Sequence, residues 1–280
     1  MVRCLTEKDV AHLPERLPAY EAELVDKTGL SLREIAIRSM EVSEEELTAA
    51  IASHTVAVVP VTAGQGVVGN FSEAVRGILS YLGVDVFKTR ESDVTGVAEG
   101  IEKGADIVFF ADDNRFVALN LPLRRVTDNA EATAKGYVTA LEAMAGDLSQ
   151  REVLVIGGAG RVGWSAVLAL KSKGARVAAC DLKQQKIESL AKGHEVIVEG
   201  NLEEALGRYT VFFDASPAAN IIEAKHIRPE TLIAAPGMPL GLTDEAYSLV
   251  ERCLIHDVLE IGVATMFVYA SCISGKSGIK

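Results

Sequence analysis

The sequence has few cysteines, and none of them are paired at a redox or metal-binding spacing. Cys4, Cys180, Cys253 and Cys272 are widely scattered and have no histidine beside them at a metal-ligand spacing. We therefore expect reduced thiols, a cytoplasmic location and no metal site. The 5 histidines form neither a zinc-binding HExxH motif nor a Ser-His-Asp order around a nucleophile elbow, so zinc-enzyme and serine-hydrolase classes lack support.

Long apolar runs and excess positive charge are also absent. The first 14 residues lack the apolar core of a secretory signal, and the uncharged stretch 261–275 falls short of the roughly 20 apolar residues of a membrane span. Lys and Arg number 28 against 39 Asp and Glu, a net charge of −11. Such an acidic chain argues against a nucleic-acid partner and an anionic membrane surface.

The composition that remains is that of a globular protein with two domains. The chain has 280 residues, of which 49% are hydrophobic and 24% charged. That length exceeds the usual size of a single core, which is roughly 100–200 residues. Residues 1–53 show helical periodicity, and Ser31 and Ser43 are each followed three residues later by a glutamate, the pattern of a capping box.

Short apolar segments alternate with helical ones after residue 55. In the first half, strands are predicted at 56–61, 84–87 and 105–110, followed by an irregular stretch from 112 to 131 and a helix over 132–145. In the second half, strands are predicted at 152–156, 176–180, 211–214 and 232–235. This alternation predicts an α/β protein: an N-terminal helical and small α/β domain (1–146) with a parallel sheet, then a doubly wound Rossmann-type domain (147–261).

A glycine-rich segment between the strand 152–156 and the next helix carries the clearest motif. Gly158, Gly160 and Gly163 form G-x-G-x-x-G, in which glycine permits a tight turn and a close backbone approach to a pyrophosphate. Asp181 follows about twenty residues later, where a carboxylate binds ribose hydroxyls and disfavours a 2′-phosphate. The pattern predicts NAD rather than NADP, although glycines also occur where helices simply pack on strands. The predicted contacts are Gly158, Ala159, Gly160, Arg161, Val162, Asp181 and Leu182.

Two proline-containing turns follow later strands of the second half. Ser216 and Pro217 come after 211–214, and the segment Pro236-Gly237-Met238-Pro239 comes after 232–235. Ligands of such sheets bind at the carboxyl ends of the strands. Ser216 and Pro217 are therefore expected beside the cofactor ribose, and 236–239 beside the nicotinamide, with Met238 facing the substrate. The alternative is that Pro and Gly only end the strands.

Polar residues in the first half are candidates for substrate contacts. Asp112 and Asp113 follow the strand 105–110 and are expected to face the same cleft as the nicotinamide, unless they only form a turn. Asp128 and Asn129 precede the helix 132–145, where either could serve as an N-cap instead. The segment 62–66 is either a ligand-facing glycine turn or a simple connection.

Several segments together resemble the PylD family, the NAD-dependent pyrrolysine synthases. They are Val59–Gly66, Ala111–Asp113 with Arg115–Phe116, Asp128–Asn129 with Glu131–Thr133, the glycine loop and Ala234–Gly241. The resemblance runs nearly end to end. It implies that a C-terminal helix within 262–280 returns to the first domain, beside the two domains already predicted.

The resemblance also implies a reaction. Such an enzyme oxidises the terminal amine of the dipeptide-like substrate 3-methyl-D-ornithyl-N6-L-lysine, releases ammonia and closes a pyrroline ring. Asp112 would then bind the amine as the catalytic carboxylate, Asp113 could replace it, Asn129 would hydrogen-bond the substrate and Leu5 would cover it. A shikimate-dehydrogenase-like enzyme, a non-enzymatic NAD-binding sensor and a possible homodimer remain open.

Overall fold

The computed structural model describes residues 6–62 and 69–272. Leu5 and positions 63–66 of the expected glycine turn lie outside the described residues. The chain divides into two compact units, and the division passes between Gly136 and Tyr137. Within the described residues, unit 1 comprises 24–30 and 137–258, and unit 2 comprises 6–23, 31–62, 69–136 and 259–272.

The N-terminal region is helical, as predicted. Its helices are α1 (Glu7–Val10), α2 (Leu13–Thr28), α3 (Leu32–Met40) and α4 (Glu44–Ser53). Both predicted capping boxes form. Ser31 Oγ accepts from Glu34 N at 3.2 Å while Glu34 Oε2 accepts from Ser31 N at 2.8 Å. Ser43 and Glu46 repeat this exchange at the start of α4. Satisfying the first amides of each helix fixes where these helices begin.

Unit 2 contains a mixed five-stranded sheet rather than the parallel sheet that was expected. Its strands are β1 (Thr55–Val59), β2 (Asp85–Lys88), β3 (Ile107–Ala111), β4 (Phe116–Asn120) and β5 (Arg125–Asp128). The order is β2-β1-β3-β4-β5, with β1, β2 and β3 parallel and β3, β4 and β5 antiparallel. The prediction of an irregular stretch at 112–131 was therefore wrong. Strand β4 is stabilised by pairing with β3, and β5 by pairing with β4, which local periodicity does not reveal.

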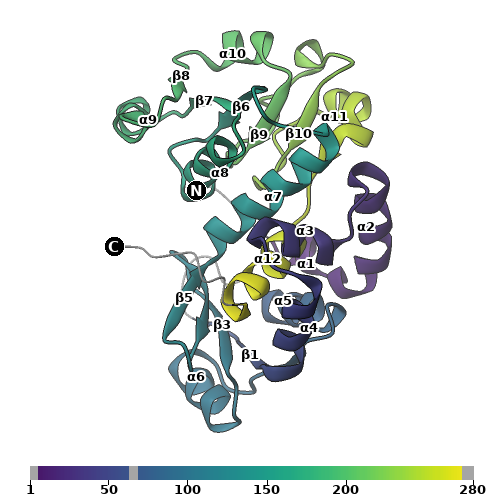
Figure 1. Cartoon of the computed structure of the whole chain (residues 1–280), viewed down its shortest axis with the longest axis vertical. Helices are drawn as coiled ribbons and strands as arrows, with labels where there is room; N and C mark the ends of the chain where they lie inside the picture. The colour runs from purple at the N-terminus through teal and green to yellow at the C-terminus, as the bar shows by residue number, and fades with distance from the viewer. Residues whose placement is uncertain (1–5, 63–68, 273–280) are drawn as a thin grey trace. The chain divides into compact units, whose positions relative to one another are not determined.

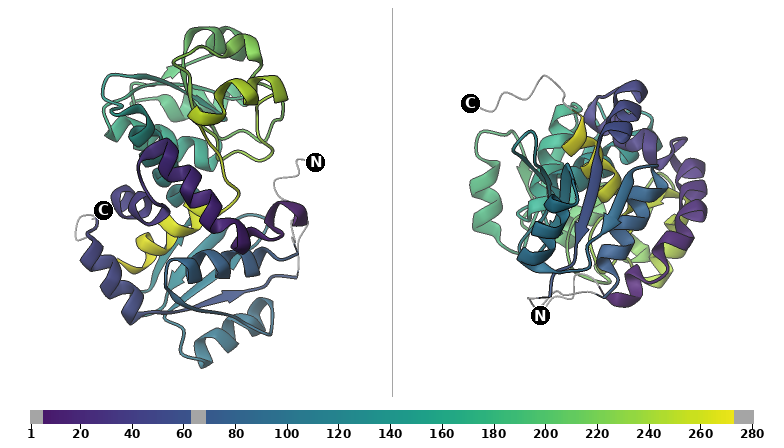
Figure 2. Two further views of the ribbon diagram at one scale, coloured as in Figure 1. Left: turned by 90° about the vertical axis from the view of Figure 1, so that its right-hand side faces the viewer. Right: turned by 90° about the horizontal axis from the view of Figure 1, so that it is seen from below.

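Three further helices pack in unit 2: α5 (Phe71–Tyr81), α6 (Asp93–Glu102) and α12 (Glu260–Ser271). Every residue of α12 except Tyr269 is buried. The helix contacts α3, α4, α5, β4 and β5, and Figure 2 shows it in yellow beside the N-terminal helices and the strands of this unit. Asn120 Nδ2 donates to Ala270 O at 3.0 Å, and the Arg125 guanidinium lies 4.6 Å from the Tyr269 ring centre. This apolar helix is thus buried inside unit 2.

Unit 1 contains a six-stranded parallel sheet of the Rossmann type (Figure 1). Its strands are β6 (Glu152–Ile156), β7 (Arg176–Cys180), β8 (Ile197–Val198), β9 (Val211–Asp214), β10 (Leu232–Ala234) and β11 (Leu254–Ile255). The order β11-β10-β9-β6-β7-β8 is the doubly wound order, with a switch point between β6 and β9. The four predicted strands are confirmed. The two-residue strands β8 and β11 were not predicted, because so few residues carry no periodic signal.

One helix leads into the parallel sheet of unit 1, and further helices connect its strands. They are α7 (Asn129–Ala145), which begins in unit 2, α8 (Arg161–Ser172), α9 (Gln184–Ala191), α10 (Leu202–Arg208) and α11 (Asp244–Val250), with short 3-10 turns η1 (Ala224–His226) and η2 (Glu251–Cys253). Strand residues such as Leu154, Phe212 and Ile233 are fully buried. In the described part of the chain, no helix is both long and apolar enough to cross a membrane.

Candidate functional site

The glycine-rich turn joins β6 to the N-terminus of α8. Gly157 has φ +76°, in the left-handed region that glycine favours, and Gly160 is the N-cap of α8. A Cβ at Gly158 would lie 3.0 Å from Ala179 Cβ, and a Cβ at Gly163 would overlap Gly157 O. Glycine therefore lets the turn lie against β7 and lets α8 approach the turn. This is the cradle that a pyrophosphate needs at a helix N-terminus.

Asp181 lies at the end of β7 and is hydrogen-bonded to that turn. Its Oδ2 accepts from Ala159 N at 2.9 Å, and its Oδ1 accepts from Lys183 N at 2.8 Å. The next residue, Leu182, is fully exposed, with a relative accessibility of 103%. The structure thus brings together the glycine loop, the acidic residue and an unpacked apolar side chain.

The turns after β9 and β10 lie at the same carboxyl edge of the sheet. Ser216 is buried and Pro217 is exposed, whereas Pro236 and Met238 are half-buried. Gly237 N donates to Asp214 O at 3.0 Å, and a Cβ at Gly237 would overlap Ser216 O. The two predicted turns are therefore in direct backbone contact with each other.

Asp214, the last residue of β9, was not identified from the sequence. It is completely buried, and its Oδ1 accepts from Ser216 N at 3.0 Å and from Ser216 Oγ at 2.7 Å. Its Oδ2 has no hydrogen-bond partner among the described residues. Burial raises the pKa of Asp214 to about 6, against the opposing effect of the two Ser216 hydrogen bonds. A carboxylate that ends an otherwise apolar strand, Val-Phe-Phe-Asp, is the signal that could have marked it.

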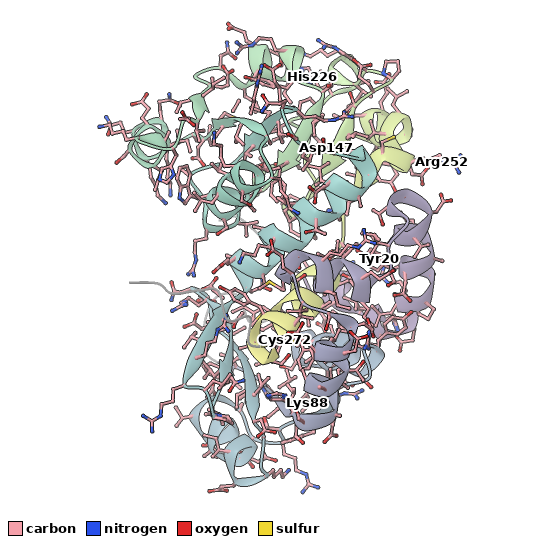
Figure 3. All side chains as sticks on the ribbon, in the orientation of Figure 1. Tyr20, Lys88, Asp147, His226, Arg252 and Cys272 are labelled. Carbon is pink, nitrogen blue, oxygen red and sulfur yellow. The ribbon has the colours of Figure 1, made fainter. Side chains whose placement is uncertain are left out.

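Two histidines of unit 1 have ring nitrogens within hydrogen-bond distance of a neighbouring group. His256 follows β11, and its Nδ1 lies 2.6 Å from Ala235 O, next to the Pro236 turn. His226, labelled in Figure 3, is buried, and its Nδ1 accepts from Glu223 N at 3.0 Å while its Nε2 lies 3.2 Å from Glu203 Oε2. The ring of His226 therefore ties η1 to α10. His256 was given no role from sequence, because no motif surrounds it.

Asp112 forms the turn between β3 and β4. Its Oδ1 accepts from Arg115 N at 2.7 Å and from Asn114 N at 2.8 Å, and its backbone N donates to Arg115 O. These two backbone amides, that of Arg115 first, lower the pKa of the exposed Asp112 carboxyl, so it is a carboxylate at neutral pH. Both of its side-chain hydrogen bonds in the described part of the chain use Oδ1.

Residues 128 and 129 lie beside this turn. Arg115 donates to Asp128 Oδ2 from Nε at 3.1 Å and from Nη2 at 2.9 Å, and Asp128 Oδ1 accepts from Ala130 N at 2.9 Å. Asp128 therefore caps α7, and Asn129 is its first residue. Unit 2 thus brings Asp112, Arg115, Asp128 and Asn129 together from the β3–β4 turn, β5 and α7.

Asn129 also lies against α12. Its Oδ1 is buried and has no hydrogen-bond partner among the described residues. A Cβ at Gly262 would lie 2.6 Å from Thr133 Oγ1 and 3.2 Å from Asn129 Oδ1. A buried acceptor without a donor is costly, and one at a predicted site is suited to a ligand N–H.

Thr62 is the described residue of the expected glycine turn after β1. Its N donates to Asp93 Oδ1 at 3.0 Å, and its Oγ1 donates to Asp93 Oδ2. These bonds lower the pKa of the Asp93 carboxyl, the Oγ1 bond first. The contact holds Thr62 against the first residue of α6.

The residues of unit 1 fit a nicotinamide dinucleotide. Such a cofactor is usually bound by a glycine turn, the helix that follows it and an acidic residue at the end of the second strand. Unit 1 has all three: the turn that side chains would fill, the 12-residue helix α8 and Asp181 after β7. Within the described residues, no group of three or more His, Cys, Asp or Glu could hold a metal ion. Burial raises the pKa of Cys180, beside Asp181, to about 12, so this thiol stays protonated at neutral pH.

Comparisons with known proteins agree with this architecture. Residues 9–127 match the family model described as pyrrolysine biosynthesis protein PylD, N-terminal domain. The chain is 30% identical over 263 residues to a pyrrolysine synthase of Methanosarcina acetivorans, covering 94% of this chain and 97% of the relative. A pyrrolysine synthase of Methanosarcina barkeri is 30% identical over 265 residues, covering 94% of this chain and 95% of the relative.

A solved structure with a similar fold is quinate dehydrogenase from Corynebacterium glutamicum in complex with NAD. It superposes with a TM-score of 0.56 at 13% identity, over 79% of this chain and 94% of that one. At this identity the likeness concerns the fold alone, and it agrees with the α/β architecture and the Rossmann-type sheet of unit 1.

Proposed function

Because this chain belongs to the pyrrolysine synthase family, we propose that it is an NAD-dependent dehydrogenase that acts on a CH–NH2 group. Its substrate would be 3-methyl-D-ornithyl-N6-L-lysine, whose terminal primary amine it oxidises with release of ammonia and closure of a pyrroline ring. The observation that carries the proposal is the relationship to two pyrrolysine synthases over almost the whole length of both chains.

Unit 1 would hold the cofactor. The backbone amides of the glycine loop and of the first turn of α8 would bind the pyrophosphate. The exposed side chain of Leu182 would pack against the adenine. Ser216, Pro217 and Pro236 would border the ribose and nicotinamide. When bound, the nicotinamide ring accepts a hydride from a substrate carbon. The pyrophosphate contacts would be Gly158, Ala159, Gly160, Arg161 and Val162.

Asp181 favours NAD over NADP. Its carboxylate lies at the end of β7 and is held by Ala159 N and Lys183 N. In this position it can accept hydrogen bonds from ribose hydroxyls, and its negative charge would repel a 2′-phosphate.

Unit 2 would hold the substrate. Asp112 is our choice for the residue that binds the substrate ammonium, because its carboxylate is fixed by the turn and is ionised at neutral pH. Because the pKa of Asp112 is lowered, its carboxylate is suited to bind the substrate ammonium but is a weak base. The proton of the ammonium would therefore be released to water. Asn129 would accept a substrate N–H at its unpartnered Oδ1. Asp113 of this unit would be a further contact and Leu5 would cover the substrate, while Met238, a residue of unit 1, would contact it as well.

The structure of the substrate determines which bonds form and break in the reaction. The terminal amine must be neutral when its carbon loses a hydride, because the nitrogen lone pair forms the new C=N bond as the hydride leaves. The second amine of the methylornithyl part then adds to this carbon, and ammonia leaves. The product ring therefore keeps one C=N bond and gains no oxygen. The protein has only to bind the ammonium, orient its carbon and release the proton.

The test is NADH formation by the purified chain with NAD⁺ and the dipeptide, run beside shikimate and beside NADP⁺. We expect turnover with the dipeptide and NAD⁺ only. Asp112→Asn keeps the Oδ1 acceptor of the turn but loses the charge, so we expect folding to be unchanged and kcat/KM to fall by about a hundredfold or more. Turnover of shikimate, or NAD⁺ binding without turnover of either compound, would instead favour the dehydrogenase or sensor alternatives.

The domain limits 1–146, 147–261 and 262–280 and the possible homodimer stay predictions. Light scattering of the purified chain measures the oligomeric state directly, and limited proteolysis tests the domain limits.

A further inference from the structure

Three backbone segments of unit 1 meet around Asp214, and two of them contact its carboxylate directly. The turn after β9 is joined to it through Ser216, whose N and Oγ both donate to Asp214 Oδ1. The turn after β10 is joined to the main chain of Asp214 through Gly237, whose N donates to the carbonyl oxygen of Asp214 at 3.0 Å. The end of that second turn, Gly241, lies against Asp214 Oδ2.

Gly241 extends this contact to a third segment. Its carbonyl accepts from Ile221 N at 2.8 Å and from Ile222 N at 2.9 Å. A Cβ at position 241 would overlap Asp214 Oδ2 and would lie 3.3 Å from Ile221 Cγ1. Glycine is therefore required here by the carboxylate itself, and the backbone of 241 remains close enough to hold 221–222 in place.

We propose that Asp214 is a positioning residue of the cofactor site, which holds the Ser216 turn and the 236–241 turn in one fixed arrangement. The inference rests on the proposed binding of NAD, in which both turns border the ribose and nicotinamide. Asp214 itself is completely buried and would touch neither cofactor nor substrate. It acts through Ser216 and through the backbone packed on its second oxygen.

The chemistry of the contact explains why an acceptor is needed. Ser216 is buried, so its N–H and O–H would lose water on folding and must find a partner inside the protein. Asp214 Oδ1 supplies both hydrogen bonds. Asparagine has an equivalent oxygen, whereas alanine has none and would also leave empty volume beside Gly241.

The experiment is a titration of NADH, followed by its fluorescence, into the full chain and its variants. Asp214→Asn should bind NADH within about threefold of wild type, because it keeps the acceptor, while Asp214→Ala should bind about tenfold more weakly or worse. Ser216→Ala should lie between them. The double variant Asp214→Ala, Ser216→Ala should bind no more weakly than Asp214→Ala alone, since the two residues act as one unit.

A substitution at Gly241 tests the same proposal independently, and it can be used even if Asp214→Ala does not fold. Gly241→Ala should weaken NADH binding by about tenfold, because the new methyl displaces Asp214. In the Asp214→Ala background the same substitution should add little, since its clashing partner is gone. Gly207→Ala is the matched control, because nothing lies within 4 Å of a Cβ there, and it should leave binding unchanged.

Each outcome decides something. Folded Asp214→Ala and Gly241→Ala variants that bind NADH like wild type would overturn the inference while leaving the proposed function intact. Additive losses in the Asp214–Ser216 cycle would reduce Asp214 to a general structural role and also overturn it. A wild-type chain that binds no NADH would overturn the proposed function and the inference together.

Discussion

Replacing Asp214 by asparagine should make unit 1 harder to unfold at neutral pH, and this gain should vanish in acid. The carboxyl group is completely buried, and burial raises its pKa to about 6. Because the folded chain binds this proton more tightly than the unfolded chain, the stability that Asp214 contributes is fully present below about pH 4 and is lost as the pH rises through about 6. Above that pH the folded chain carries a poorly solvated charge.

The magnitude follows from the two pKa values. The gap between 3.8, the ordinary value, and about 6 in the folded chain corresponds to about 3 kcal/mol. Asparagine keeps the acceptor for Ser216 and does not titrate. The difference in the free energy of unfolding between Asp214→Asn and wild type should therefore grow by up to about 3 kcal/mol between about pH 4 and pH 7.

Urea unfolding from about pH 4 to pH 8 measures this difference. The chain has 1 tryptophan, Trp164 on α8, so its fluorescence reports on unit 1. Other titrating groups are common to wild type and variant and cancel in the comparison. Asp147→Asn, at an exposed aspartate of the same unit, is the matched control and should not reproduce the trend.

A difference that stays flat across this pH range would refute the reasoning, because it would mean that Asp214 titrates alike in both states. A variant that loses stability as the pH rises would refute it more strongly. That result would show a partner that stabilises the Asp214 anion.

Three other predictions concern single positions. Gly163→Ala places a methyl group on Gly157 O, so NADH affinity should fall by at least about tenfold in a fluorescence titration; unchanged affinity would contradict the cradle geometry. Asp181→Ala removes the charge that we propose repels a 2′-phosphate. The ratio of kcat/KM for NADP⁺ to that for NAD⁺ should therefore rise by about tenfold or more, and a constant ratio would argue against this proposed role. Gly262→Ala places a methyl group against Thr133 Oγ1, so the free energy of unfolding should fall by about 1–3 kcal/mol in urea melts; an equally stable variant would mean that α7 and α12 can separate there at little cost.

Features that depend on neighbouring residues could be predicted from the sequence. The capping boxes at Ser31 and Ser43 formed, because each involves groups only three residues apart. The four longer strands of unit 1 could also be predicted, because the strands of a parallel sheet that is buried on both faces are continuous apolar runs. The glycine loop belongs to the same class, since its strand, turn and helix are contiguous in the chain.

Features that depend on pairing could not be predicted this way. Strand β4 pairs with β3 and β5 pairs with β4, both antiparallel, and nothing in their own few residues distinguishes these strands from a loop. The turn residue Asp112 illustrates the same limit for sites. The sequence left open whether it forms a turn or faces a ligand, and the structure shows the turn hydrogen bonds at its Oδ1.

The sequence by itself determined the fold class, the family resemblance and the positions of the glycine loop and Asp181. Each of these depends on which residue types stand near one another in the chain. Only the tertiary structure decided what surrounds Asp214. Ser216 is two residues away, but Gly237 and Gly241 reach it from the next strand of the sheet, and its burial comes from segments distant in sequence. Burial, displaced water and close backbone approach arise from packing, so no local pattern of residues records them.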